Sequence, residues 1–379
     1  MAFLPADPPL TLEDLVGMCR PTDSSGLAGW VPGRLTFFDS GRSALWAALT
    51  RLGIGPGHEV LLPAYLCDSV VSPVRAVGAR PTFYPIGREM LLDLGALATM
   101  IGPQTRAVIL IHYLGFPAPV HEVRQLCASA GLALIEDCAH ALFSRLGDRL
   151  LGSIGDAAIF SPWKSLPLPD GGLLALNSSD DGSEQRLDQP SALATMARLA
   201  YRALGAVETR AGWSPRSGLL RRPGLRRRLH DRTSGAPVRP RLGSRISWRL
   251  LRGAPAEQIV ARRRENYRLL LDNSSDLGWA CPLFGDLPEG VCPLGFPLIV
   301  DQRDRWRDEL LASGVNVRTY WEHLPAQVDL ERFPDAAWLR DSTLVLPVHQ
   351  GLRSRQIDWL ARRLRALDQR KSHGTFAHR

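Results

Sequence analysis

Several common signals are missing from this chain of 379 residues. Its six cysteines contain no C-x-x-C pair, which argues against a zinc site and a disulfide framework and for reduced thiols in a cytoplasmic protein. No apolar run approaches the roughly 20 residues of a membrane-spanning helix, so we expect no transmembrane segment. The first residues, MAFLPADPPL, lack the basic and then apolar pattern of a secretory signal. What remains, 45% hydrophobic and 22% charged residues, is typical of a globular protein with an ample core.

The first half of the chain alternates strand-like with helix-like stretches. Apolar runs predict buried strands at 59–63, 82–86, 107–113, 132–137, 157–161 and 173–177. Helices are predicted at 43–53, 69–79, 94–102 and 121–131, with C-terminal glycine caps at Gly53 and Gly131. Short connections between the two kinds of element predict an α/β fold in which helices cover both faces of a mainly parallel sheet. Ligands of such folds bind beyond the carboxyl ends of the strands.

The alternation breaks between residues 178 and 245, apart from a helix expected near 191–205, and then resumes in a smaller unit. There the pattern predicts a long helix from residue 255, a strand at 295–301, a helix at 303–314, a strand at 315–321 and a last helix at 354–367. We therefore expect a large domain at 1–250 and a smaller C-terminal α/β domain at 251–379.

An arginine-rich insertion within the break supplies most of the excess in a formal net charge of +8. Such a segment suits nucleic acid, an anionic membrane surface or an acidic substrate, or it is a solvated insertion without chemistry. No aromatic residue interleaves with the arginines between 214 and 246, so we expect no nucleic-acid partner. The arginines are Arg216, Arg221, Arg222, Arg226, Arg227, Arg228 and Arg232.

Three strand ends hold residues that suit one ligand. In FFDSGRSALWAAL, a serine and Gly41 begin a helix whose free N–H groups suit a phosphate. In LALIEDCAHAL, Asp137 ends a strand, either to pair with a cation or to cap a helix. In AAIFSPWKSLPLPDGG, Lys164 stands alone in an apolar loop followed by Asp170, Gly171 and Gly172. Its amine either reaches water past Trp163 or is a desolvated nucleophile.

Together these strand ends suit pyridoxal 5′-phosphate (PLP). Its phosphate would lie at the helix start, an aspartate would keep its pyridine nitrogen protonated, and a lysine would bind its aldehyde. The motifs SGRSALWAALTRLGIGPGHEVLLPAY, VGARPTFYPI, TRAVILIHYLGFPAPVHEVRQLCASAGLALIEDCAHAL and GSIGDAAIFS follow one another in order. In this order and spacing the chain resembles the DegT/StrS-type sugar aminotransferases, which are PLP enzymes of fold type I. The resemblance runs over about 36–178 and 245–367.

The resemblance implies a role for each matching residue. Lys164 would be the Schiff-base lysine, Asp137 the partner of the pyridinium nitrogen, and His140 the side chain against the cofactor ring. Phosphate contacts would come from Gly41, Arg42, Ser43 and Ser161, and either Tyr65 or Cys67 would lie where an aromatic ring often covers the cofactor.

The resemblance also implies a function. The expected reaction moves an amino group from an amino acid, glutamate or glutamine, to a nucleotide-linked keto-sugar, in polysaccharide or secondary-metabolite biosynthesis. The expected assembly is a homodimer with its active site between the subunits. The alternatives are another PLP reaction such as sugar dehydration, which Lys164 argues against because relatives that dehydrate replace this lysine with histidine, and a non-catalytic protein that binds an anion.

Overall fold

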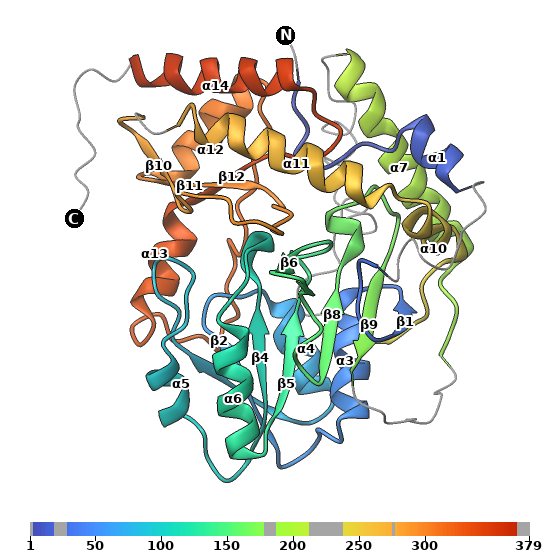
Figure 1. The fold of residues 1–379 in the computed structure, drawn as a ribbon, viewed down its shortest axis with the longest axis vertical. Helices are drawn as coiled ribbons and strands as arrows, with labels where there is room; N and C mark the ends of the chain where they lie inside the picture. Colours follow the sequence, from blue (N-terminus) through green and yellow to red (C-terminus); the bar gives the residue numbers. More distant parts are fainter. Residues whose placement is uncertain (1–2, 19–28, 178–186, 212–237, 275–276, 370–379) are drawn as a thin grey trace.

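The structure, a computed structural model, describes residues 3–18, 29–177, 187–211, 238–274 and 277–369. Seven strands form its central sheet in the order β1-β9-β8-β5-β4-β2-β3 (Figure 1). Only β9 runs against its neighbours β1 and β8, so the expected mainly parallel sheet is confirmed. The strands are β1 (Arg34–Phe38), β2 (Glu59–Pro63), β3 (Arg80–Tyr84), β4 (Thr105–Ile111), β5 (Ala133–Asp137), β8 (Ala157–Phe160) and β9 (Gly172–Leu176).

Helices cover both faces of this sheet, as the buried runs in its strands require. Figure 1 shows α5 and α6 in front of the strands and α3 and α4 behind them. The predicted glycine positions are confirmed, because Gly53 and Gly131 have left-handed backbones with φ of 68° and 65°. The helices are α3 (Gly41–Arg51), α4 (Asp68–Ala76), α5 (Leu94–Thr99) and α6 (Val120–Ala130). This arrangement confirms the three-layer α/β architecture.

A second, antiparallel sheet with the order β10-β11-β12 lies in the C-terminal part of the chain. Its strands are β10 (Ala280–Pro282), β11 (Phe296–Val300) and β12 (Thr343–Leu346). Its helices are α11 (Ala256–Leu271), α12 (Arg303–Ala312), α13 (Pro334–Ser342) and α14 (Ser354–Gln369). One hydrophobic core runs from Leu61 in the first sheet to Leu298 in the second. The expected smaller α/β unit is therefore present and packs on the larger one.

The predicted strand at 315–321 is wrong. Val315 and Arg318 make only isolated bridges, to Leu4 and Val345 respectively. The backbone then turns away from the sheet, and Trp321 has a φ of +54°. Bulky residues rarely adopt this left-handed conformation, so the alternating pattern of this segment does not give an extended strand.

The other described elements lie around the two sheets. A short hairpin joins β6 (Arg145–Leu146) to β7 (Arg149–Leu150). Helices α1 (Leu12–Gly17) and α10 (Arg245–Arg252) contact each other, and α7 (Ala192–Ala211) corresponds to the helix expected near 191–205. Within the described ranges, no helix combines the length and apolar character needed to cross a bilayer.

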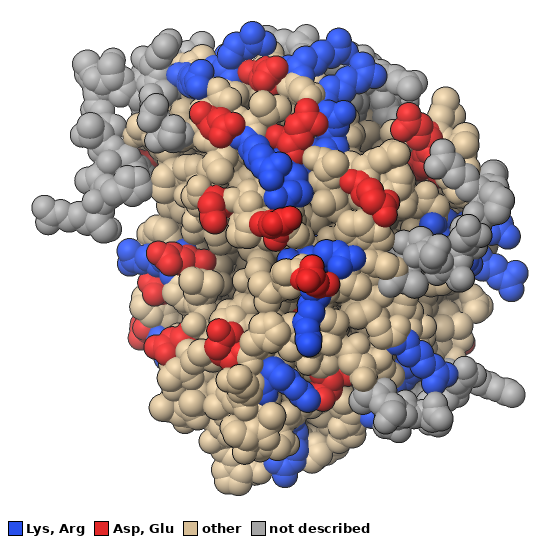
Figure 2. All heavy atoms as spheres, in the orientation of Figure 1, with Lys and Arg blue, Asp and Glu red and all other residues tan. Residues whose placement is uncertain are grey.

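The seven arginines singled out in the insertion lie outside the described residues. Among the described residues on the face drawn in Figure 2, acidic and basic side chains are interspersed. The excess of positive charge is therefore not gathered on this face.

Candidate functional site

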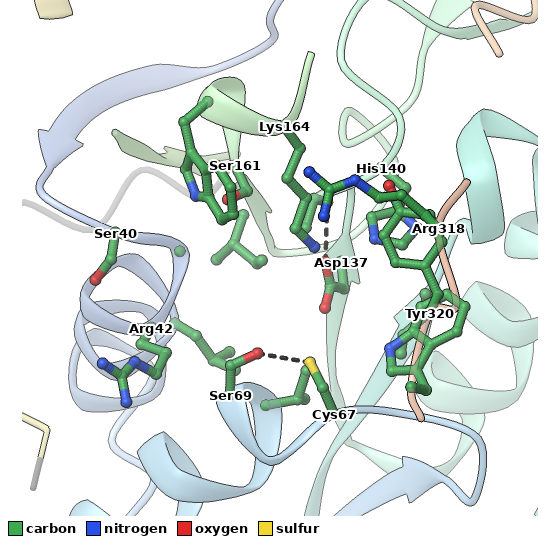
Figure 3. A pocket seen from close by; sticks show the side chains of 18 of the residues that line it. Ser40, Arg42, Cys67, Ser69, Asp137, His140, Ser161, Lys164, Arg318 and Tyr320 are labelled. Atoms are coloured by element: carbon green, nitrogen blue, oxygen red, sulfur yellow. Dashed lines mark hydrogen bonds between the residues drawn. The ribbon is translucent and has the colours of Figure 1, made fainter. Parts of the chain in front are cut away.

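A cavity of about 250 Å³ opens at the carboxyl edge of the parallel strands (Figure 3). Segments from both halves of the chain line it, including the start of α3, the ends of β5 and β8, and the segment between α12 and α13. The lining residues are Ser40, Gly41, Arg42, Leu45, Cys67, Ser69, Val70, Ile111, Asp137, Ala139, His140, Ile159, Ser161, Trp163, Lys164, Arg318, Thr319, Tyr320 and Trp321. The three predicted strand ends thus meet in one place.

The start of α3 forms one end of this cavity. Ser40 caps the helix by accepting the backbone N–H of Ser43 at 3.3 Å. The hydroxyls of Ser40 and Ser43 both donate to Asp39 Oδ1, at 2.9 and 2.6 Å. Ser43 is buried in this turn and does not line the cavity, whereas Gly41 and Arg42 do. The helix therefore presents its N-terminal end, which favours an anion, to the cavity.

Glycines keep this end open. A Cβ on Gly41 would lie 3.6 Å from Ser161 Oγ, inside the space between the helix start and the end of β8. A Cβ on Gly172, the first residue of β9, would lie 2.1 Å from the carbonyl oxygen of Ser40. Gly172 is therefore needed for the close approach of β9 to the turn that begins α3.

Asp137 and Lys164 bring opposite charges into the cavity from the ends of β5 and β8. Asp137 is buried, and its Oδ1 accepts the backbone N–H of Ala139 at 2.9 Å. Burial raises the pKa of Asp137, while the charge of Lys164 acts in the opposite direction. Burial lowers the pKa of Lys164, and the charge of Arg318 lowers it further. Cys67 and Asp137 act in the opposite direction and raise this pKa. The site therefore holds a desolvated amine beside a desolvated carboxyl group.

His140 lies on the same wall as Asp137 and is buried in its neutral form. Burial holds the pKa of His140 well below its usual value, and the charges of Lys164 and Arg318 add to this effect. Its ring centroid lies 4.9 Å from that of Tyr320 and 5.0 Å from that of Trp321. Among the described residues, its buried Nδ1 has no hydrogen-bond partner. A buried polar atom without a partner at a cavity is typical of a site that is completed by a ligand.

Cys67 and Tyr65, the two candidates for the residue that covers the cofactor ring, lie in different surroundings. Cys67 lines the cavity, with its sulfur next to the Ser69 hydroxyl (Figure 3). Tyr65 is fully buried behind the wall, where its hydroxyl donates to the carbonyl oxygen of Tyr320 at 3.4 Å. Its ring packs against Trp321 with centroids 4.7 Å apart. Of the two, only Cys67 borders the cavity.

One wall of the cavity is not predicted by the sequence pattern. Arg318, Thr319, Tyr320 and Trp321 line the cavity, although they follow Lys164 by more than 150 residues. The sequence feature that could indicate this wall is the aromatic run TYW, which lies in a segment whose pattern predicts a strand. Side chains of such a segment meet a site only through tertiary packing, which spacing along the chain does not reveal.

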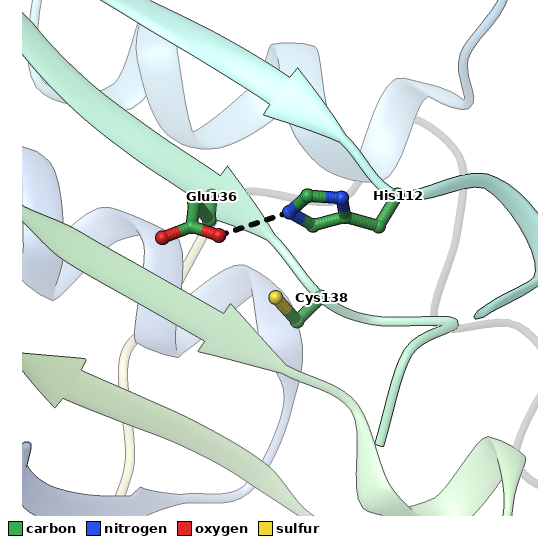
Figure 4. Close-up of side chains that lie close together, drawn as sticks. All are labelled: His112, Glu136 and Cys138. Atoms are coloured by element: carbon green, nitrogen blue, oxygen red, sulfur yellow. Dashed lines mark hydrogen bonds and ion pairs between the residues drawn. The ribbon is translucent and has the colours of Figure 1, made fainter. Parts of the chain in front are cut away.

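A buried cluster of Glu136, His112 and Cys138 lies at the end of β5, where Glu136 and Cys138 flank Asp137 in the chain (Figure 4). Glu136 accepts the backbone N–H groups of Gly152, Ile154 and Gly155 and the Nε2–H of His112, at distances of 2.6–3.0 Å. Because His112 Nδ1 accepts the N–H of Ala118, the ring proton lies on Nε2. These donors occupy both carboxylate oxygens. The cluster is therefore a structural support for the end of β5 rather than a metal site.

Asp170 has a structural role as well. It is fully buried and accepts hydrogen bonds from the backbone N–H and the hydroxyl of Ser244, at 3.1 and 3.0 Å. Ser244 is the N-cap of α10. The loop that follows Lys164 is thus anchored to this helix.

All five cysteines within the described ranges are free.

Comparison with known proteins agrees with the resemblance seen in the motifs. Residues 36–205 match the sequence model of the DegT/DnrJ/EryC1/StrS aminotransferase family. A dTDP-4-dehydro-2,3,6-trideoxy-D-glucose 4-aminotransferase from Saccharopolyspora spinosa is 29% identical over 347 residues, which cover 87% of this chain and 83% of the relative. A UDP-N-acetyl-3-dehydro-alpha-D-glucosamine 3-aminotransferase from Acidithiobacillus ferrooxidans is 34% identical over 175 residues, 45% of this chain and 46% of that one.

Among solved structures, the PLP form of the putative sugar aminotransferase Spr1654 from Streptococcus pneumoniae superposes with a TM-score of 0.71. The match covers 97% of this chain and 99% of that chain at 17% sequence identity. At this level of identity, the likeness concerns the fold, which is the fold type expected from the motifs.

Proposed function

We propose that this protein transfers the amino group of glutamate or glutamine to a nucleotide-linked keto-sugar. The chain belongs to the DegT/DnrJ/EryC1/StrS aminotransferase family. The chain is a PLP-dependent aminotransferase, as its family and relatives indicate. The relatives are named for amino transfer to dTDP-linked and UDP-linked dehydro-sugars, which supports an acceptor of this class for the present chain.

One observation of the structure supports this function most directly. The desolvated amine of the half-buried Lys164 and the buried carboxyl group of Asp137 both face the cavity that the N-terminal end of α3 also borders. This donor set fits PLP, because the cofactor needs an amine for its aldehyde, a carboxylate for its pyridine nitrogen and an anion site for its phosphate. The unpartnered Nδ1 of His140 lies on the same wall.

Each residue then has a defined task. Lys164 would hold the aldehyde, Asp137 the protonated ring nitrogen, and His140 one face of the ring. Gly41, Arg42 and Ser161 would surround the phosphate, while Ser43 would shape this end through its bond to Asp39. Cys67 would line the cofactor site together with His140, while Tyr65 is packed behind the wall.

When bound, PLP supplies an electron sink that stabilises a carbanion at the carbon bearing the amino group. The protein supplies the proton transfers around it. Asp137 would hold a proton at the ring nitrogen, with its own buried carboxylate as the counter-charge. The Nζ of Lys164 has a lowered pKa because of its burial, so a larger share of it is unprotonated near neutral pH. The amine of Lys164 can therefore take the proton from the donor's α-carbon and deliver a proton to the cofactor carbon C4′.

The remaining features of the proposal concern the whole protein. We place the boundary between a large PLP-binding domain and a small domain at residues 250/251. We propose a cytoplasmic homodimer whose product enters sugar biosynthesis for polysaccharides or secondary metabolites.

The test is an absorbance spectrum of the purified protein before and after glutamate or glutamine is added. A near-visible band that shifts on addition of the donor supports the proposed half-reaction. A protein that stays colourless when PLP is supplied contradicts it. Borohydride treatment followed by peptide mapping then locates the attached cofactor. The chain has only two lysines, Lys164 and Lys371, so attachment to Lys371 would contradict the assignment of Lys164.

A further inference from the structure

Arg318 brings a second positive charge to the Lys164 side of the cavity. The two side chains point into the same part of the cavity, above Asp137 (Figure 3). The charge of Arg318 acts on both Lys164 and His140, lowering the pKa of each. This side of the cavity lies apart from the start of α3, where the first anion site was placed. A ligand that approaches Lys164 therefore meets a guanidinium group.

Asp7 holds this guanidinium from behind. Its carboxylate forms an ion pair with Arg318 and lies 3.7 Å from the NH1 group of Arg202. Although burial alone would raise it, the pKa of Asp7 lies well below its ordinary range because of these two arginines. A guanidinium group has five N–H donors in a planar fork. Arg318 can therefore keep Asp7 on one edge and bind a second carboxylate with another.

Asp7 belongs to an arm, residues 3–10, that runs along the loop of Arg318. The N–H of Leu4 donates to Gly314 at 2.8 Å, and the N–H of Asn316 donates to Leu4 at 3.0 Å. Farther along the arm, the carbonyl oxygen of Pro5 accepts a hydrogen bond from His349 Nε2 at 3.0 Å. These contacts place Asp7 in register with Arg318.

The backbone of Arg318 is held from the other side by β12. Its N–H and carbonyl group exchange hydrogen bonds with Val345, at 3.0 and 2.9 Å. The main chain of this arginine is therefore fixed by the sheet, whereas its side chain depends on Asp7. With 34% of its side chain accessible, Arg318 retains surface for a ligand.

We propose that Arg318 binds the carboxylate of the amino-acid donor and that Asp7 is the positioning residue that orients it. The proposal rests on the proposed function. In an amino acid the carboxylate is bonded directly to the α-carbon, whose proton Lys164 must reach. In a nucleotide-linked sugar, several bonds of the ring separate the phosphate from the carbonyl carbon. An anion site beside Lys164 therefore suits the donor's carboxylate rather than the acceptor's phosphate.

The experiment compares the holoenzyme with its Arg318→Gln and Asp7→Asn variants. Calorimetry with glutarate, a dicarboxylate without an amine, measures carboxylate binding in the absence of reaction. Kinetics with glutamate and a keto-sugar separate KM from kcat. Losing a charged hydrogen-bond partner should weaken glutarate binding in Arg318→Gln by about 10-fold to 100-fold and raise the donor KM equally. Asp7→Asn should weaken both in the same direction, and the acceptor KM should not change.

Two further variants act as controls. Asp7→Glu keeps the charge and should restore much of the binding lost in Asp7→Asn. Asp14→Asn removes a nearby carboxylate that only caps α1, and it should leave glutarate binding and the donor KM unchanged. If Asp7→Asn does not fold, Asp7→Glu and Arg318→Gln decide the question.

Unchanged glutarate binding in Arg318→Gln would overturn the proposal, and so would a rise in the acceptor KM alone. These results are separate from a failure of the proposed function. If the unaltered enzyme converts neither glutamate nor glutamine, the proposed donor is wrong, while the glutarate measurement still reports on the carboxylate site.

Discussion

The hydrogen bonds around Glu136 predict how much stability the substitution Glu136→Gln removes. The two oxygens of Glu136 each accept two hydrogen bonds: Oε1 from the N–H groups of Ile154 and Gly155, and Oε2 from Gly152 and His112. Glutamine has the same shape but only one oxygen. Whichever way its amide is oriented, the NH₂ group faces two donors that then have no acceptor.

The expected loss of stability follows from these two donors. A buried hydrogen-bonding group left without a partner costs about 1–3 kcal/mol, so the variant should lose about 2–6 kcal/mol of unfolding free energy. The pH dependence has a defined sign. Hydrogen bonds from His112 and the backbone outweigh burial and lower the pKa of Glu136 below its ordinary value of 4.5. The contribution of Glu136 to the unfolding free energy is therefore complete above pH 4.5 and is lost as the pH falls through the folded-state pKa.

Urea unfolding followed by tryptophan fluorescence, at a series of pH values, measures the difference between the two proteins. We expect a large difference at pH 7 that narrows below about pH 4.5, because protonation of Glu136 removes an acceptor in the unaltered protein as well. Hydrogen exchange should be faster at the amides of Gly152 and Gly155 in the variant. A difference below about 1 kcal/mol at pH 7, or one independent of pH, would refute the assigned network.

Four other changes have defined outcomes. Lys164→Ala should abolish turnover and the donor-dependent spectral shift, since no other lysine lies within the described ranges, and single-turnover spectra check this. Asp137→Asn should weaken PLP binding, measured by fluorescence titration; affinity equal to that of the unaltered protein would argue against its pairing with the ring nitrogen. Gly172→Ala should lower PLP affinity and thermal stability, because its Cβ would lie 2.1 Å from the carbonyl oxygen of Ser40. His349 has a pKa lowered from 6.5 to about 4 by burial, so protein stability should fall as the pH drops from 6.5 towards 4; this loss, up to about 3 kcal/mol, should be absent in His349→Gln.

Much of the fold can be predicted from the sequence because its signals are local. The buried runs at β2, β4 and β5 predict strands, and the glycines after α3 and α6 mark where these helices end. Lys164 and Asp137 follow directly from this pattern, since residues at the carboxyl ends of parallel strands share one edge of the sheet. The composition also singles out Lys164, because the chain has only two lysines among 379 residues.

The rest depends on packing that the pattern does not contain. Alternation at 315–321 favours a strand, yet the chain leaves the sheet after Arg318 and turns at Trp321. Tyr65 stands at the expected position along the chain, but its ring packs behind the wall against Trp321 rather than in the cavity. Which side of a loop faces a cavity is decided by neighbours far away in sequence.

The contact between the arm and the loop of Arg318 has a consequence for biosynthesis. Leu4 pairs with Gly314 and Asn316, so during synthesis the arm can make these contacts only after the loop of Arg318 has been translated. The sheet of β2, β4 and β5 has all its strands long before that point, since folding during synthesis proceeds from the N-terminal end. The wall formed by Arg318 and Trp321 closes only after the chain has been translated through these residues. Translation through the loop of Arg318 therefore limits how early the cavity, and with it the activity, can appear.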